Sequence, residues 1–215
     1  MSEHPDVLLY EKEAWASGFL RLAGIDEAGR GPLAGPVVAA AVIFEPGYIE
    51  RELAIVYGRL TDSKAMSEKK RDEYFDILQG AAAVQVGVGV VEPEEIDDIN
   101  ILKATHKAMG IAAAQVGADF ALVDGLPFKG LPCGHKAIVK GDALSISISA
   151  ASIIAKVTRD RMMVALDARY PEYGFAAHKG YGTKQHLEAL RRYGATPAHR
   201  RSFRPVAELN QLDLL

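Results

Sequence analysis

Four acidic residues of this chain stand where short apolar stretches end: Asp26, Glu27, Asp124 and Asp142. Each stretch has the composition of a buried strand, so three strands are expected to carry these carboxylates to one rim of a sheet. Gathered carboxylates repel one another unless a cation neutralises them, and ligand sets made of oxygen alone suit Mg²⁺ or Mn²⁺. The pattern therefore predicts a site for one or two of these ions.

Two aspects of the acids leave alternatives open. An aspartate at a strand end can simply cap the next helix, although three such residues together with Glu27 fit that explanation poorly. Asp26 and Glu27 are also sequence neighbours, and neighbours on a regular strand point to opposite faces. Both can then reach the same ions only if the strand distorts at Ala28 and Gly29, or if a backbone carbonyl replaces one side chain.

A glycine-rich loop, residues 29–35, follows the first acidic pair and has the form GxGxxxG. A dinucleotide-binding loop of this kind must lead into a helix, whose N-terminus holds the pyrophosphate. Here Pro36 and the apolar stretch 37–44 predict a strand instead, which disfavours that function. A tight turn is the plain alternative, but it leaves Arg30 unexplained, because a planar guanidinium suits a phosphate.

The elements that would position these residues form a mixed α/β sheet. Apolar or alternating stretches predict five strands, at residues 20–28, 36–44, 83–91, 120–124 and 137–140. Helical composition and capping residues predict helices at 11–18, 67–79, 93–116, 144–170 and 184–193. The first three strands form a meander, and the last two alternate with helices as parallel strands do. We expect helices to flank this five-stranded sheet and a helical region to end the chain.

The bulk properties are those of an ordinary globular chain of 215 residues with a formal charge of −3. Nucleic-acid binding would therefore depend on local basic patches. Cys133 is the only cysteine, so an intrachain disulfide is excluded and a reducing compartment fits. The polar residues 1–6 lack a secretory pattern and no apolar run is long enough to span a bilayer. We expect a cytoplasmic protein without membrane contact, which we take to be a monomer.

Six blocks of the sequence are more specific than any single loop. They are residues 24–32 (GIDEAGRGP), 61–64 (TDSK), 123–125 (VDG), 140–142 (KGD), 149–160 (SAASIIAKVTRD) and 178–183 (HKGYGT). In this order they resemble the bacterial ribonuclease HII family. The resemblance implies an RNase H-like fold, and we expect a catalytic domain at 1–180 followed by a helical region and tail at 181–215. It also implies that the catalytic, metal-binding residues are Asp26, Glu27, Asp124 and Asp142.

The activity that this resemblance implies is hydrolysis of RNA paired with DNA. The family cuts the RNA strand of RNA–DNA hybrids and the 5′ side of single ribonucleotides embedded in duplex DNA, leaving 5′-phosphate and 3′-hydroxyl ends. Roles in ribonucleotide removal and RNA primer removal would follow. The positions that read the RNA–DNA junction correspond to Gly29, Arg30, Gly31 and Tyr181. On the residues alone, Tyr181 between two glycines could equally be a packed loop anchor.

Further substrate contacts are expected on the helix predicted at 144–170. Its polar residues recur on one face at Ser149, Ser152, Lys156 and Arg159. A polar stripe in an apolar segment suits a phosphate backbone, with a solvated helix face as the alternative. Other phosphate-contact candidates, which could also be ordinary surface residues, are Lys64, Arg200, Arg201 and Arg204.

The last five residues resemble the short motif that binds the bacterial sliding clamp: Gln211, Leu212, Asp213, Leu214 and Leu215. Leucines at a chain end need a pocket, which could also lie on this chain's own core. Two functions remain as rivals to the nuclease, namely a catalytically inactive hybrid-binding module and a dinucleotide-dependent oxidoreductase. The four acids argue against the first, and the strand predicted after the glycine-rich loop argues against the second.

Overall fold

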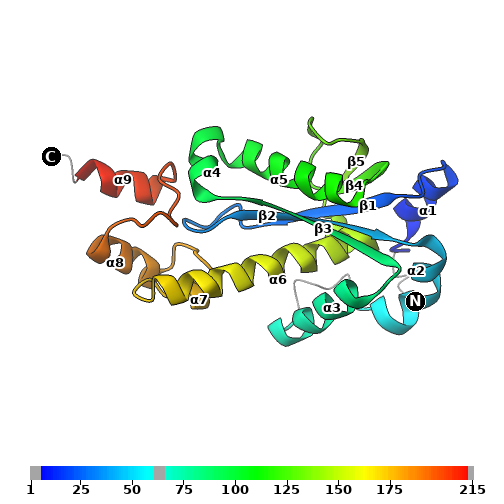
Figure 1. The fold of residues 1–215 in the computed structure, drawn as a ribbon, viewed down its shortest axis with the longest axis horizontal. Helices are drawn as coiled ribbons and strands as arrows, with labels where there is room; N and C mark the ends of the chain where they lie inside the picture. The colour runs from blue at the N-terminus through cyan, green and yellow to red at the C-terminus, as the bar shows by residue number, and fades with distance from the viewer. Residues whose placement is uncertain (1–5, 61–65, 213–215) are drawn as a thin grey trace.

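The computed structural model describes residues 6–60 and 66–212, with side chains described as far as Leu209. A sheet lies in the middle of the molecule (Figure 1). Helices α4 (Pro93–Ile99) and α5 (Ile101–Val116) cover one face, and the long helix α6 (Ile146–Arg169) covers the other. The C-terminal helices α8 (Lys184–Tyr193) and α9 (Arg204–Leu212) lie at one end of the molecule.

The sheet has five strands: β1 (Leu22–Ala28), β2 (Val37–Phe44), β3 (Val84–Val91), β4 (Phe120–Asp124) and β5 (Gly134–Ile138). Their order is β3-β2-β1-β4-β5, with antiparallel pairing among the first three and parallel pairing of β1 with β4 and of β4 with β5. The predicted mixed sheet is confirmed. The last strand starts three residues earlier than predicted, because Gly134 already pairs with Phe120, and it ends early because the chain turns at Lys140, where φ is 58°.

The remaining helices are α1 (Leu9–Ala16), α2 (Pro46–Glu52), α3 (Glu68–Gly80) and α7 (Phe175–His178), with a π-helical turn η1 (Leu53–Tyr57) and a 3-10 turn η3 (Gly141–Ala143). Two predicted caps are confirmed, because Ser67 and Thr183 accept hydrogen bonds from the first turns of α3 and α8. The single helix predicted at 93–116 is wrong. Asn100 takes a left-handed φ of 70° there, and its side chain caps a second helix, α5. Helices α2 and α7 were not predicted.

Two glycines let helices approach the sheet closely. A Cβ on Gly24 of β1 would lie 2.0 Å from the carbonyl carbon of Ser147 in α6. A Cβ on Gly89 of β3 would lie 2.0 Å from the carbonyl oxygen of Ala108 in α5. No side chain fits at either position. The backbone of α6 therefore lies directly on β1, which brings polar residues of α6 beside the end of that strand.

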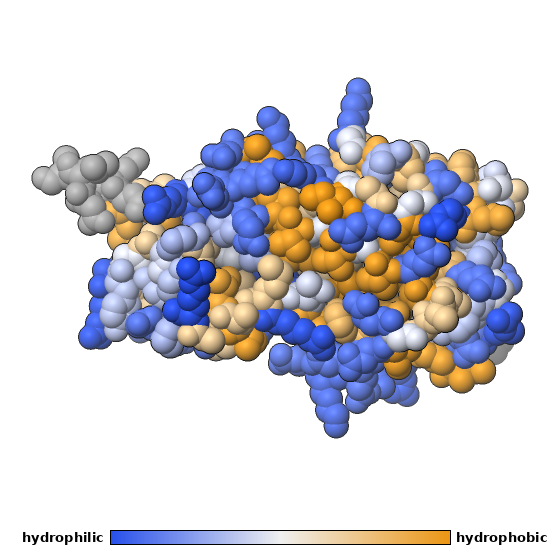
Figure 2. Space-filling view, in the orientation of Figure 1, coloured by the Kyte–Doolittle hydropathy of each residue, from blue (hydrophilic) through white to orange (hydrophobic). Residues whose placement is uncertain are grey.

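The edge strand β3 borders the face shown in Figure 2, where hydrophobic surface follows the path of this strand. Val86, Val88 and Val90 are only half-buried there. The side-chain amide of Gln115 donates to the carbonyl of Val88 and accepts from its N–H, both at 2.9 Å. Part of the exposed strand edge is thus covered by a side chain that imitates a neighbouring strand. Among the described residues, no helix is both long and apolar enough to cross a bilayer.

Residues on both sides of position 180 share one core. This core includes Leu33, Ala34, Met163, Phe175 and Leu190. Two backbone hydrogen bonds of 2.8 Å, from Leu33 N–H to Gly180 and from Gly35 N–H to Ala198, join the glycine-rich loop to the C-terminal segments. The domain boundary expected at 180 stays a prediction. Residues 29–35 are hereafter called the glycine loop, and the packing described here joins this loop to segments that are distant in sequence.

Candidate active site

The four predicted acids lie along one rim of the sheet, hereafter the acidic rim: Asp26, Glu27, Asp124 and Asp142. The first two are near the end of β1, the third ends β4, and the fourth lies in η3, just after β5. Because β1, β4 and β5 are parallel to one another, their carboxyl ends meet at the same edge. The topology of the sheet therefore brings acids from three separate segments together.

Asp26 is buried on the α6 side of β1, with 7% of its surface exposed. Burial, and then the negative charges of Glu27 and Asp124, raise the pKa of Asp26 to about 8. Two hydrogen bonds oppose this shift, one from the hydroxyl of Ser152 and one of 2.7 Å from the N–H of Glu27 to Oδ1. Near neutral pH the carboxyl group therefore keeps a proton unless a cation takes its place.

Glu27 points to the face of the sheet opposite to Asp26. Ile25 packs in the core beneath α5 whereas Gly24 contacts α6, so the alternation of a regular strand places Glu27 on the α5 side. Pairing with β2 continues as far as Ala28, and the chain turns only at Gly29, where φ is 95°. The strand is therefore regular between the two acids. Their carboxylates approach the acidic rim from its two sides.

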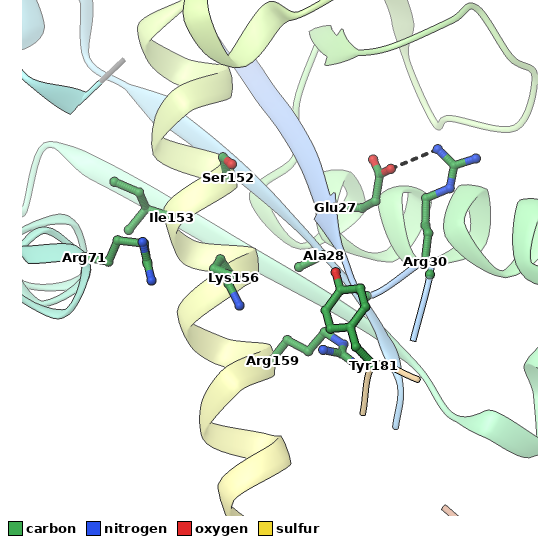
Figure 3. Close-up of a pocket in the computed structure, with 11 residues that line it drawn as sticks. Glu27, Ala28, Arg30, Arg71, Ser152, Ile153, Lys156, Arg159 and Tyr181 are labelled. Atoms are coloured by element: carbon green, nitrogen blue, oxygen red, sulfur yellow. Dashed lines mark hydrogen bonds and ion pairs between the residues drawn. The ribbon is translucent and has the colours of Figure 1, made fainter. Parts of the chain in front are cut away.

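The carboxylate of Glu27 is paired with Arg30, whose Nη1 donates to Oε1 at 3.1 Å (Figure 3). Burial raises the pKa of Glu27, the hydrogen bond and charge of Arg30 lower it, and the charge of Asp124 raises it. The Arg30 side chain is 53% exposed, so water competes for its guanidinium. The Glu27 side chain is only 14% exposed, so the arginine end of the pair lies in water and the carboxylate end does not.

The backbone of η3 connects the last two acids, because the N–H of Gly141 donates to Oδ1 of Asp124 at 2.6 Å. Asp142 follows directly and is 5% exposed. Across the described part of the chain, no three acidic, histidine or cysteine side chains are close enough to form a ready-made ion site. The chemistry of the donors nevertheless fits a divalent cation. All donors are oxygens, and Asp26, Glu27 and Asp124 repel one another.

A pocket of about 550 Å³, hereafter the loop pocket, opens between α6 and the glycine loop beside the acidic rim (Figure 3). It gathers most of the expected substrate contacts: Gly29, Arg30, Gly31, Ser152, Lys156 and Tyr181. Glu27 also lines it, so the pocket and the acidic rim share a residue. Segments separated by more than a hundred residues in sequence thus form one continuous site.

Tyr181 lies directly beside Gly31 in the wall of the loop pocket. A Cβ on Gly31 would lie 3.6 Å from ring carbon Cε1 of Tyr181, and the tyrosine is 50% exposed. A half-exposed ring is not a packed anchor, so the structure favours the interpretation of Tyr181 as a contact residue. Gly180, which precedes Tyr181, accepts a hydrogen bond from the N–H of Leu33. This bond fixes the backbone next to Tyr181 to the glycine loop.

The polar stripe predicted on α6 divides between the loop pocket and the core. Ser152 and Lys156 line the pocket, and Lys156 also donates to Asp160 at 2.6 Å. Ser149, in contrast, is fully buried, and its hydroxyl donates to the carbonyl of Leu60 at 2.6 Å. Contrary to the prediction, Ser149 does not face the pocket, because this turn of α6 packs against the segment that leads to Leu60.

Two arginines that were expected to contact phosphate, Arg159 and Arg200, instead donate hydrogen bonds to backbone carbonyls of the protein itself. Arg159 reaches the wall of the loop pocket, but it is 1% exposed and its guanidinium donates to the carbonyls of Pro36, Lys179 and Ala34. Arg200 is fully buried and donates to carbonyls of the glycine loop. Both side chains therefore support the loop from behind.

Two features of the site were not anticipated. Arg71 of α3 also lines the loop pocket, and the run of cations at 69–71 was a signal for it. A second pocket of about 310 Å³ lies on the α5 side of Glu27 and includes Asp124, His106 and Phe128. The rings of His106 and Phe128 stack with centroids 4.0 Å apart. No sequence pattern marks these two residues, because they meet only when α5 packs beside the loop after β4.

The glycine loop leads into β2 rather than into a helix. It therefore offers no helix N-terminus to a pyrophosphate, and the dinucleotide-binding alternative is rejected. Some expected residues lie outside the described residues: Lys64 with its block 61–64, Asp213, Leu214 and Leu215. Gln211 and Leu212 belong to α9 by their backbone, and their side chains are likewise outside the description.

Residues 23–206 match the family model for ribonuclease HII. The chain belongs to the ribonuclease HII family. It is accordingly an endoribonuclease, a hydrolase with RNase H activity, in a family that depends on divalent metal ions. The match spans all four acids, the glycine loop and Tyr181.

Two ribonucleases HII are similar to this chain over nearly its whole length. The ribonuclease HII of Acholeplasma laidlawii is 51% identical over 206 residues, covering 95% of this chain and 97% of the relative. The ribonuclease HII of Geobacillus kaustophilus is 52% identical over 206 residues, covering 95% of this chain and 76% of the relative.

Solved structures support the same fold. The crystal structure of ribonuclease H2 from Pyrococcus horikoshii is 30% identical with a TM-score of 0.73, covering 89% of this chain and 97% of that one. RNase HII of Archaeoglobus fulgidus, solved in complex with PCNA, is 25% identical with a TM-score of 0.72, covering 86% and 95%. Bst-RNase HIII in complex with Mn²⁺ is 16% identical with a TM-score of 0.71, covering 99% and 75%, and supports the fold alone.

Proposed function

We propose that this ribonuclease HII family member cuts the RNA strand of RNA–DNA hybrids and the 5′ side of single ribonucleotides embedded in duplex DNA. The products carry 5′-phosphate and 3′-hydroxyl ends, which suits a role in removing ribonucleotides and RNA primers. The position of the loop pocket supports this proposal, because Glu27 belongs both to the pocket and to the acidic rim. A nucleotide in the pocket would have its phosphate beside the carboxylates.

The acidic rim would hold one or two Mg²⁺ or Mn²⁺ ions through Asp26, Glu27, Asp124 and Asp142. Because β1 is regular between the first two, Asp26 and Glu27 would approach the ions from opposite faces, or a backbone carbonyl would replace one of the two side chains. Such ions, when bound, activate a water molecule and stabilise the departing 3′-oxygen. To serve as a ligand, Asp26 must first lose the proton that its pKa of about 8 retains. Glu27 would hold the ion through its carboxylate, of which only Oε1 accepts from Arg30, and the guanidinium of Arg30 would lie close enough to the acids to meet a phosphate oxygen.

Selection of RNA would depend on the 2′-hydroxyl. Gly29 and Gly31 carry no Cβ, so backbone groups of the glycine loop can approach a sugar closely. A site built to hydrogen-bond a hydroxyl rejects a sugar without it by on the order of 10⁴-fold, since its polar groups are then left unpaired. Tyr181 would stack on the deoxyribose of the next nucleotide, where another 2′-hydroxyl would clash.

Backbone phosphates would be held around the same pocket by polar side chains from two helices. Ser152 and Lys156 project from α6, and Arg71 projects from α3 (Figure 3). Lys64 remains a further candidate. These contacts set the register of the duplex but carry no information about sugar type.

The test is cleavage of a DNA duplex with one ribonucleotide against an all-DNA duplex, with and without Mn²⁺ or Mg²⁺. We expect a single cut on the 5′ side of the ribonucleotide, only with the ion. Asp124→Asn should bind the same duplex and lose cleavage, while Asp98→Asn, at an exposed position, should cut normally. Normal turnover by Asp124→Asn would refute the assignment. Binding without any cutting by the wild type would favour the inactive hybrid-binding module.

A partner can also be proposed for the tail. The Archaeoglobus fulgidus RNase HII forms a complex with PCNA, and we propose that residues 211–215 bind a bacterial sliding clamp. Deletion of these five residues should abolish co-purification with a bacterial clamp and leave cleavage of free duplex unchanged. Equal retention of the truncated and complete chains on the clamp would dismiss this role.

A further inference from the structure

Arg200 occupies an unusual position behind the glycine loop. It is fully buried, and each nitrogen of its guanidinium donates to a different carbonyl: Nε to Gly35 at 3.0 Å, Nη1 to Arg30 at 3.0 Å and Nη2 to Gly29 at 2.6 Å. Its own N–H donates to Leu33 at 2.8 Å. One residue from the far end of the chain thus holds four carbonyls of residues 29–35.

Arg159 holds the same loop from α6, with hydrogen bonds to Ala34 and Pro36. Burial, and then the charge of Arg159, lower the pKa of Arg200 to about 9. Neither guanidinium forms an ion pair within 4.0 Å with a carboxylate in the described part of the chain. Two buried cations without such partners are costly, and an ordinary tight turn does not require them. The free-energy cost of burying these two guanidinium groups is expected where the backbone conformation of the glycine loop is important for function.

The hydrogen bonds of Arg200 determine where the loop's N–H groups point. In a trans peptide unit the C=O and the following N–H point in opposite directions, and the described chain contains no cis peptide bond. Because the carbonyls of Gly29 and Arg30 point inward to Arg200, the N–H groups of Arg30 and Gly31 point outward. Arg30 and Gly31 are both exposed and line the loop pocket. The buried guanidinium therefore aims two donors at the pocket.

We infer that Arg200 is a positioning residue for ribonucleotide selectivity: by fixing two adjacent peptide units it presents the N–H groups of Arg30 and Gly31 to the sugar that carries the 2′-hydroxyl. This inference rests on the proposed function. Lysine cannot replace Arg200 in this role. An ammonium is a point charge on a flexible stem and cannot hold three carbonyls in the plane of a guanidinium.

The experiment compares Arg200→Lys with Arg192→Lys, an exposed arginine of the same C-terminal region. Each is made in the Asp124→Asn background, so that binding is measured without cutting. The affinity ratio for a one-ribonucleotide duplex over an all-DNA duplex is measured for each. We expect Arg200→Lys to lower this ratio about tenfold, with affinity for all-DNA duplex within about twofold of its parent, as for one lost, well-oriented hydrogen bond to the sugar. Arg192→Lys should leave the ratio unchanged.

An unchanged ratio in Arg200→Lys overturns the inference, and so does an equal loss of affinity for both duplexes, which would indicate a merely structural role. A second measurement needs no Arg200 variant. In ¹⁵N-labelled protein carrying only Asp124→Asn, the amide signals of Arg30 and Gly31 should shift with the ribonucleotide duplex and not with all-DNA duplex; identical shifts overturn the inference. If the wild type fails to cut at a ribonucleotide at all, the proposed function fails instead.

Discussion

The imidazoles of His186 and His199 meet through their Nε2 atoms, 3.1 Å apart, inside the C-terminal core. Nδ1 of His186 lies 2.9 Å from the carbonyl of Tyr181, and Nδ1 of His199 accepts from the N–H of Thr196 at 3.0 Å. These partners define the tautomers. His186 must donate through Nδ1, so its Nε2 accepts the proton that His199 donates. This series of hydrogen bonds ends at the backbone carbonyl of Tyr181, whose side chain lines the loop pocket, and it requires both imidazole rings to be neutral.

This arrangement predicts that acid destabilises the protein through these histidines. Burial, and then the charge of His186, lower the pKa of His199 to about 4 from an ordinary 6.5. Because the unfolded chain takes up the proton first, the stabilisation is complete above pH 6.5 and is lost as the pH falls toward 4. A shift of this size corresponds to at most about 3 kcal/mol. Thermal unfolding measured between pH 7 and 4 should show it.

The control for this prediction is His199→Gln, which keeps a donor toward His186 and cannot be protonated in this range. It separates the histidine effect from that of the buried acids, which acts in the opposite direction. The wild type should lose more stability than the variant between pH 6.5 and 4.5. Parallel curves for the two proteins would contradict the prediction.

Asp26→Asn is predicted to stabilise the metal-free protein at alkaline pH. The raised pKa of Asp26 means that its protonated form is preferred in the folded state, so its stabilising contribution is present below 3.8 and lost as the pH rises to about 8. Asparagine never ionises. The Tm of the variant should therefore rise above that of the wild type by several degrees at pH 8.5, at about 2–4 °C per kcal/mol, and the gap should shrink toward pH 5.

The same variant should lose metal-dependent cleavage. Asp98→Asn removes an exposed carboxylate and should change neither the Tm difference nor the cleavage. If Asp26→Asn were less stable than the wild type at pH 8.5, the ionised Asp26 carboxylate would not destabilise the folded protein, and the prediction would be wrong.

Ion binding is predicted to compete with the proton on Asp26. Below pH 8 the ion must displace this proton, so Mn²⁺ affinity should rise up to about tenfold per pH unit and level off above pH 8. Titration calorimetry in buffers of different ionisation enthalpy at pH 7 should detect release of about one proton per binding event. An affinity independent of pH between 6 and 8 would place the ion away from Asp26. Removal of the ion with a chelator should stop cleavage.

Two alanine substitutions in the glycine loop are predicted to have different effects. Gly29 has a φ of 95°, and a Cβ there would lie 2.0 Å from Nε of Arg159. Gly29→Ala should cost at least about 1–2 kcal/mol, which lowers Tm by roughly 2–8 °C. A Cβ on Gly31 meets only the Tyr181 ring, at an ordinary 3.6 Å. Gly31→Ala should keep its Tm and weaken binding of the ribonucleotide duplex, because it narrows the pocket. Equal Tm losses would contradict this contrast.

The rim of acids was predictable from the sequence. Short apolar stretches predicted the strands and placed Asp26 and Asp124 at strand ends, while the pairing of β1 with β4, which joins those ends at one edge, was expected from the alternation of strands with helices. Helix caps could also be predicted, because Ser67 and Thr183 accept hydrogen bonds from N–H groups within the next turn of the chain. The alternation along β1 is equally local, and it places Asp26 and Glu27 on opposite faces. Features governed by neighbours a few residues away are therefore predictable.

The tertiary structure alone decided the roles of polar residues that lie far apart in sequence. Periodicity placed Ser149 on the same helix face as Ser152, but the segment ending at Leu60 covers only the first of them. Arg200 was expected to contact phosphate or to be an ordinary surface residue, and its guanidinium turns inward only because the C-terminal segment packs behind a loop 165 residues earlier. Whether a polar side chain is buried or faces the pocket depends on which distant segment packs against it. A local sequence pattern does not contain that information.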